Sequence, residues 1–116
     1  MDAVALNEAL IESIRGKGAL TIPEVAGELA VLGVAVEGDR ALFQSENVVV
    51  WIDLSGEAVA ALQRLVADER SEVTTAMPAT YAMEGALLEY PLVTGSGIKR
   101  GYKTPHWLPL EIAVRP

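Results

Sequence analysis

Apolar residues recur every three or four positions in three stretches of the chain, the spacing that lines one face of an α-helix. In residues 3–15 the repeat is carried by Leu6, Leu10 and Ile14. Residues 22–32 and the segment Ser55–Ala67 show the same period. We therefore predict three amphipathic helices. The apolar faces expected in the second and third are Ile22, Val25, Ala26, Leu29 and Leu32, then Ala58, Val59, Leu62, Leu65 and Val66.

The start of the second helix carries the clearest local signal. Thr21-Ile22-Pro23-Glu24 has the T-x-x-E pattern of a capping box, in which the Thr hydroxyl accepts from the Glu amide and the Glu carboxylate accepts from the Thr amide. Pro23 falls in the first turn, where its missing N–H costs nothing. Ser55 is expected to cap the third helix, and the polar run Asp68–Glu72 to be its solvated end.

Between the second and third helices the pattern changes to short β-rich runs separated by turn residues. Residues 34–54 are expected to hold several short strands. The run Val48–Ile52 is apolar at every position, which predicts a strand covered on both faces.

The last third of the chain is predicted to be β-structure. Tyr81–Met83 and Ala86–Val93 read as strands separated by the turn Glu84-Gly85. In residues 108–114 apolar and other residues alternate strictly, as in a strand with one wet face. The expected result is a hairpin over Ala86–Val114 that encloses a glycine-rich loop, Thr94–His106.

Composition restricts the possible chemistry of the protein more than it restricts the possible folds. The chain has 116 residues, of which 51% are hydrophobic, with one histidine and no cysteine. This excludes a disordered protein and a disulfide scaffold, and leaves no set of residues for a Cys–His zinc cluster or a histidine-based triad. We expect no enzyme activity, no metal and no cofactor. The longest apolar run, Leu29–Val36, is too short to span a membrane, and no secretory signal is evident, so a cytoplasmic protein is expected.

Charge is unevenly distributed. The net charge is −7, yet residues 97–116 hold four bases (Lys99, Arg100, Lys103 and Arg115) and one acid. Three of these bases lie in the loop Thr94–His106, beside Tyr102. Neither a dinucleotide fingerprint nor a Walker loop fits this segment, because the third glycine comes one residue late and Tyr102 stands where a Walker loop needs glycine. The loop is interpreted either as a flexible arm that tracks phosphates or as a solvated tip that balances an acidic body.

Taken in order, helix, capped helix, strands, third helix and terminal hairpin with a basic loop resemble a winged helix-turn-helix domain over residues 4–114. The resemblance implies an α+β fold with three helices, a small antiparallel sheet and a C-terminal wing hairpin, in one domain over residues 1–116. In DNA-binding members the third helix enters the major groove and the wing contacts the backbone. It implies nucleic-acid contacts from Gln63 and Arg64 on the third helix and from Lys99, Arg100, Tyr102 and Lys103 on the wing.

Two features depart from the family pattern. Some twenty residues separate the second and third helices, and the third helix carries Glu57, Asp68 and Glu69, which suits a phosphate groove poorly. The expected function is therefore nucleic-acid binding through the wing, for example by a transcriptional regulator on duplex DNA. The alternative is a winged-helix interaction or assembly module that binds a protein partner or a second copy of itself without DNA.

Overall fold

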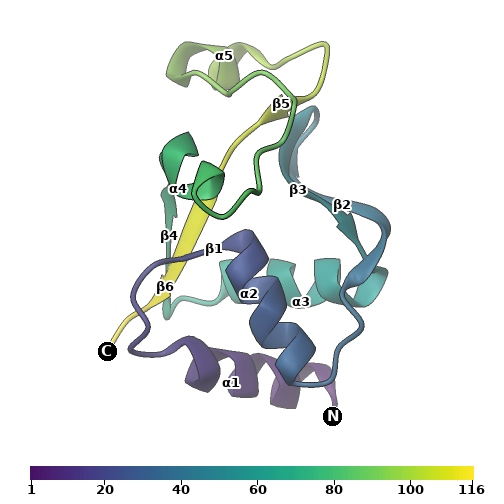
Figure 1. Ribbon diagram of the computed structural model, residues 1–116, viewed down its shortest axis with the longest axis vertical. Helices are drawn as coiled ribbons and strands as arrows, with labels where there is room; N and C mark the ends of the chain where they lie inside the picture. The colour runs from purple at the N-terminus through teal and green to yellow at the C-terminus, as the bar shows by residue number, and fades with distance from the viewer.

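A computed structural model describes residues 1–116 as an α+β fold of five helices and two small sheets (Figure 1). The helices are α1 (Ala3–Ile14), α2 (Ile22–Val31), α3 (Gly56–Ala67), α4 (Pro78–Ala82) and α5 (Gly95–Arg100). The strands are β1 (Leu20–Thr21), β2 (Glu37–Ser45), β3 (Val48–Leu54), β4 (Ser71–Thr75), β5 (His106–Trp107) and β6 (Leu110–Val114). None of the helices is long and apolar enough to span a membrane.

Helices occupy the three segments where they were predicted, and the predicted caps start two of them, but the fold has five helices and not three. The Thr21 hydroxyl accepts from the Glu24 amide at 3.3 Å, and the Glu24 carboxylate accepts from the Thr21 amide at 2.9 Å. The Ser55 hydroxyl accepts from the Ala58 amide at 3.0 Å. Because these signals are local in sequence, they fix the helix starts without help from tertiary contacts.

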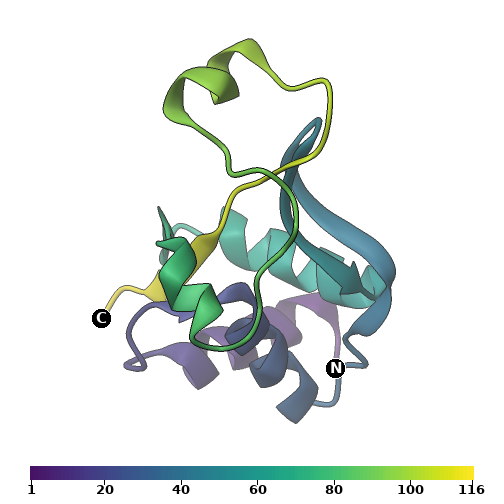
Figure 2. The same cartoon turned by 45° about the horizontal axis from the view of Figure 1, so that its top comes forward.

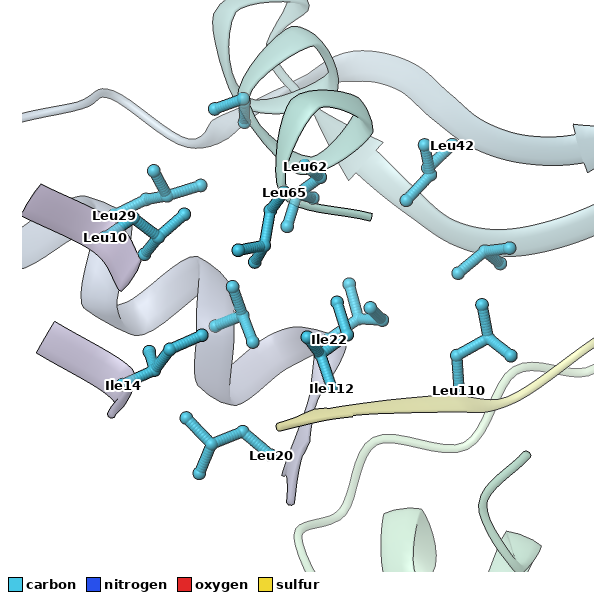
Figure 3. Close-up of a cluster of buried hydrophobic side chains, with 14 of the residues drawn as sticks. Leu10, Ile14, Leu20, Ile22, Leu29, Leu42, Leu62, Leu65, Leu110 and Ile112 are labelled. Atoms are coloured by element: carbon cyan, nitrogen blue, oxygen red, sulfur yellow. The ribbon is translucent and has the colours of Figure 1, made fainter. Parts of the chain in front are cut away.

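The first sheet has the order β1-β6-β4, and both of its pairings are antiparallel. Its inner face rests on α1, α2 and α3. Figure 3 shows side chains from the three helices and from β1 and β6 meeting in one core, with Leu10, Leu29 and Leu62 from the helices and Ile112 from β6. These four side chains are fully buried, as the apolar periodicity predicted for three helical positions and for the alternating strand.

The second sheet has the order β2-β3-β5 and is built on the hairpin of β2 and β3, which appears to the right of the helices in Figure 1. Val48, Val49 and Val50 are buried, as expected for a strand covered on both faces, whereas Trp51 and Ile52 are half-buried. The hairpin register shifts several times, and Gly38 lies directly against the main chain of Leu54. A side chain at residue 38 would collide with that strand, so the close crossing requires glycine.

Two strand predictions are wrong. Residues 81–83 form the end of helix α4 and the residue after it: Pro78 starts the helix, and the left-handed Gly85 follows shortly after it. Residues 86–93 form no strand, although Leu92 makes an isolated parallel bridge with Trp107. They cannot pair with β6, because β1 and β4 already occupy both of its edges.

One of the two partners of β6 begins within the polar run Asp68–Glu72, which the sequence pattern assigned to a solvated helix end. Ser71–Thr75 forms β4, and the Ser71 hydroxyl is buried and donates to the main-chain oxygen of Leu65 at 2.7 Å. The predicted hairpin over residues 86–114 is therefore replaced by a β4–β6 pair with a connection of more than thirty residues. That connection contains α4, α5 and β5.

Candidate nucleic-acid interface

Residues 94–106, which we call the α5 lobe, project from the rest of the molecule (Figure 2). The sequence pattern predicted a flexible loop here, and the structure instead shows a short helix. The Thr94 hydroxyl accepts from the Gly97 amide at 3.2 Å and caps α5, and Gly101, with a φ of 76°, ends it. A positive φ at this point favours glycine, because a side chain would be strained there.

Tyr102 folds back over the start of α5 and holds the lobe together. Its hydroxyl accepts from the Thr94 amide at 2.9 Å, and its ring stacks on the ring of His106 with centroids 3.7 Å apart. The ring also fills the space that a side chain at Gly97 would need. Tyr102, predicted as a nucleic-acid contact, is thus half-buried and has an internal structural role.

The tip of the β2–β3 hairpin anchors the lobe to the body. The side-chain amide of Asn47 donates to the main-chain oxygen of Tyr102 at 2.8 Å. The main-chain oxygen of Asn47 accepts from the His106 amide, also at 2.8 Å. Asn47 has a φ of 59°, a conformation that asparagine tolerates better than most residues. Asn47 thus holds the segment that follows α5, a contact that the sequence of the lobe alone does not reveal.

The three predicted wing bases are exposed and free of partners. Lys99 and Arg100 occupy the last turn of α5, where the negative end of the helix dipole favours cations, and Lys103 lies just beyond Gly101. None of the three makes an ion pair or a side-chain hydrogen bond. By contrast, Arg15, Lys17, Arg70 and Arg115 are each paired with a carboxylate. The lobe therefore carries most of the chain's uncompensated positive charge.

Helix α3 presents the other two predicted contacts. Gln63 and Arg64 are both exposed, and Arg64 has no ion-pair partner. The acids of this helix region still oppose an anion. Beyond its C-terminal end, hydrogen bonds from Arg70 hold the pKa of Asp68 well below its usual range. Asp68 is thus ionised and shares its cation with Glu8, which leaves these three groups one net negative charge, and Glu57 and Glu69 are exposed.

A groove of about 600 Å³ brings α3 and the α5 lobe to one face of the molecule. Gln63, Val66 and Ala67 of α3 line one part of it, and Ile98 of α5 lines another. The groove is also lined by Leu42, Phe43 and Gln44 of β2, Val50 of β3, Val73, Thr74 and Thr75 of β4, Leu108 between β5 and β6, and Leu110 of β6. Two of the predicted contact regions are therefore neighbours in space.

The groove also corrects one prediction about the core. Val66 was expected on the buried face of the third helix, but 36% of its surface is exposed. Phe43 and Ile98, at 51% and 37% exposed, complete an apolar rim that sequence patterning did not identify as a site. Their exposure depends on where β2 and α5 pack against α3, and no local motif reports that.

The chain has no group of three or more histidine, aspartate or glutamate side chains placed to hold a metal ion. Comparison with known proteins gave no match to a family model, a curated protein or a solved structure.

Proposed function

We propose that this protein is a nucleic-acid-binding protein of winged-helix type that grips duplex DNA through the phosphate backbone, with the α5 lobe as its main anchor. The observation that carries the proposal is the set of three exposed, unpaired bases, Lys99, Arg100 and Lys103, on a lobe that stands off the body (Figure 2). Lysine and arginine bind phosphates by displacing condensed counterions, whatever the base sequence. A cytoplasmic regulator of transcription fits this activity.

The arrangement of elements supports the winged-helix assignment. Helices α1, α2 and α3 pack around one core, and the antiparallel pair β4–β6 follows α3. The connection between β4 and β6 then takes the place of the wing, with α4 and the α5 lobe within it. The β2–β3 hairpin accounts for the additional residues between α2 and α3 and supports the lobe through Asn47.

Because the lobe projects, its bases lie away from the acidic body, which is expected to repel DNA phosphates. The chain outside residues 97–116 holds fifteen acids and five bases. Screening at physiological salt limits charge interactions between exposed groups to about 8 Å. Bases on a projecting lobe can thus meet a phosphate with little repulsion from any acid that lies farther away than this distance.

Helix α3 supplies the second contact in this proposal. Gln63 shares a groove with Ile98, which directly precedes Lys99. A duplex held by the lobe would therefore bring base edges or backbone towards Gln63 and Arg64. Since phosphate contacts position a protein and base contacts give specificity, the lobe should set affinity and α3 should set sequence preference.

Binding of a fluorescent 20-base-pair duplex at several salt concentrations tests this proposal. Three phosphate contacts predict a slope of log K against log salt near −2.7, at about −0.9 per phosphate. The variant Lys99→Gln/Arg100→Gln/Lys103→Gln should lose most of the affinity and flatten that slope. The matched control, Arg15→Gln/Lys17→Gln/Arg115→Gln, removes three paired bases and makes the same change in net charge. It should bind like the parent protein.

Equal losses in the two variants would show that binding follows net charge and would reject the lobe as the anchor. Absence of binding by the parent protein even at low salt would reject nucleic acid as the partner. In that case the second candidate function, an interaction module for another protein, takes its place. One observation favours it: no residue that lines the groove against α3 is charged, and most are apolar.

A further inference from the structure

Strand β4 has a free edge beside the apolar groove. In the sheet order β1-β6-β4 it is the outer strand, and no helix or strand lies beyond it in either view (Figures 1 and 2). Its residues Val73, Thr74 and Thr75 line the groove directly. An uncovered strand edge is a template on which another extended chain can pair.

The hydrogen bonds of the β4–β6 pair show which main-chain groups remain free. The Arg115 amide donates to the oxygen of Arg70, and the Ala76 amide donates to the oxygen of Pro109. Along an antiparallel strand, every second residue directs its main-chain N–H and C=O groups at the same neighbour. Glu72 and Thr74 therefore also direct these groups at β6. Val73 and Thr75 therefore direct their N–H and C=O groups outwards, and no bond outside the ladder involves them.

Side chains complete the requirements of a strand-binding site. The Val73 side chain packs against the core, so the residue paired with it on an added strand would point to the same inner face. That face carries the exposed apolar surfaces of Phe43, Val66 and Ile98. Strand addition draws affinity from main-chain bonds and specificity from pockets for alternate side chains, and both features occur together here.

Charge indicates which kind of segment would fit. All thirteen residues that line the groove are uncharged, although the chain carries sixteen acids. Five charged residues are next in sequence to lining residues: the bases Arg64 and Lys99 and the acids Asp68, Glu72 and Glu111. Asp68 and Glu72 are paired with Arg70 and Arg115, whereas both bases lack an ion-pair partner. A segment with apolar residues in the groove and acidic residues at its ends would therefore be stabilised both by the apolar contacts and by the two bases.

We propose that β4 and this groove bind an extended segment of a partner protein by strand addition, with two apolar side chains at alternate positions and acidic flanks. The inference deepens the second candidate function, the interaction module, and does not depend on nucleic-acid binding. Only one of the three lobe bases, Lys99, also enters this proposal, and the residues that its test variants and NMR signals use, Val66, Val73 and Thr75, are separate from all three. Failure of one proposal can therefore be told from failure of the other.

The test uses the full chain and a phage-displayed library of random peptides. Selected peptides should share an apolar-x-apolar core with aspartate or glutamate on either side. A synthetic peptide of that consensus should shift the amide signals of Val73 and Thr75 in a ¹⁵N correlation spectrum. The variant Val66→Glu should weaken its binding by roughly tenfold or more, because the new carboxylate is desolvated and faces like charges.

The matched control is Val31→Glu, which places the same change on α2 at a valine that is 82% exposed and does not line the groove. It should bind the peptide like the parent protein. A second variant, Thr75→Pro, removes one outward N–H and should weaken binding while leaving the ladder to β6 intact.

Four results would overturn the proposal. The library could yield no consensus, or the selected peptide could bind Val66→Glu as well as the parent. Mass measurements could show a dimer that Val66→Glu dissociates, which would make a second copy the occupant. Finally, duplex DNA rather than peptide could shift the Val73 and Thr75 signals.

Discussion

The hydroxyl of Tyr81 donates to the main-chain oxygen of Leu110 at 2.6 Å and accepts from the amide of Ile22 at 3.0 Å. Thr21 pairs with Glu111 in the β1–β6 ladder, so Ile22 and Leu110 are the next residues in register. The phenol thus takes the place of the next main-chain bond. The Tyr81 hydroxyl therefore extends the β1–β6 pairing by one bridged residue pair and connects α4 to the sheet.

Tyr81→Phe should lower the free energy of unfolding by about 1–3 kcal/mol, since it leaves a buried amide and a buried carbonyl without this partner. The ring can keep its edge-to-face contact with Trp107, at a centroid distance of 5.1 Å. Urea unfolding at neutral pH measures the loss. A midpoint equal to that of the parent would show that the two bonds add nothing to stability.

The same residue makes stability sensitive to alkaline pH. Burial raises the pKa of Tyr81 to about 12 from an ordinary value of 10.0. The unfolded chain therefore ionises first, so the stabilisation from the neutral phenol is complete below pH 10 and is lost as the pH rises towards 12. The difference in unfolding free energy between the parent and Tyr81→Phe should therefore fall steadily over that range. A constant difference would contradict this prediction.

The carboxylates of Glu24 and Glu84, near Thr21, should also make the protein less stable as the pH rises, but in a lower pH range. Burial, with repulsion from Glu24, raises the pKa of Glu84, whose carboxylate accepts from the Thr21 hydroxyl at 2.9 Å. Its contribution is complete below pH 4.5 and falls as the pH rises through the raised value. Glu84→Gln keeps an acceptor and should raise the thermal midpoint at pH 7 but not at pH 4. Glu89→Gln, which removes an exposed charge nearby, should raise neither.

The capping box itself should be worth about 1–2 kcal/mol to the fold. Thr21 is buried and its hydroxyl serves both the Glu24 amide and the Glu84 carboxylate, so Thr21→Ala breaks two bonds. Thr21→Ser keeps the hydroxyl and is the matched control. Guanidinium unfolding of the two variants separates the hydroxyl from the methyl group. Equal losses in both would assign the effect to packing.

These contacts show where sequence reasoning succeeds and where it stops. The Thr21–Glu24 box and the apolar repeats are complete within a few residues, so the pattern predicted α1, α2, α3 and the alternating strand β6. Tyr81 lies in a short apolar run that suits either a strand or a buried helix turn. Pro78 and Gly85 flank the helix turn locally, and the bond from Tyr81 to Leu110, nearly thirty residues away, fixes it against the sheet.

The candidate site likewise has one part that the sequence could predict and one part that it could not. Lys99, Arg100 and Lys103 could be found from charge and flanking glycines, because exposed bases need no tertiary partner to be exposed. The free edge of β4 could not, because the polar segment Asp68–Glu72 has the composition of a loop. It becomes partly a strand because β6 offers it an edge, and tertiary pairing of this kind overrides local propensity.

The core prediction concerns Leu29, which is fully buried between the helices and the sheet (Figure 3). Leu29→Ala should destabilise the protein by about 2–5 kcal/mol through lost burial and a residual cavity. Val31→Ala, two residues along α2 and largely exposed, should have almost no effect. Similar losses in both variants, measured by denaturant unfolding, would mean that α2 is rotated from the orientation shown.

The last prediction tests the internal order of the α5 lobe. A Cβ at residue 97 would strike the Tyr102 ring, whereas one at residue 95 would meet nothing within 4 Å. Gly97→Ala should therefore push Tyr102 away from His106, and Gly95→Ala should not. His106 is the only histidine, so its ring protons give a single resolved NMR signal set, shifted upfield by the stacked phenol. In Gly97→Ala these signals should move downfield towards their unstacked positions. Identical His106 spectra in the two variants would show that Tyr102 does not pack over α5.

Where the Gly97→Ala spectrum changes as expected, the DNA affinity of this variant then separates two roles of the lobe. Affinity equal to that of Gly95→Ala would mean that charge alone suffices, and a clear loss would mean that the placement of Lys99 and Arg100 by α5 matters.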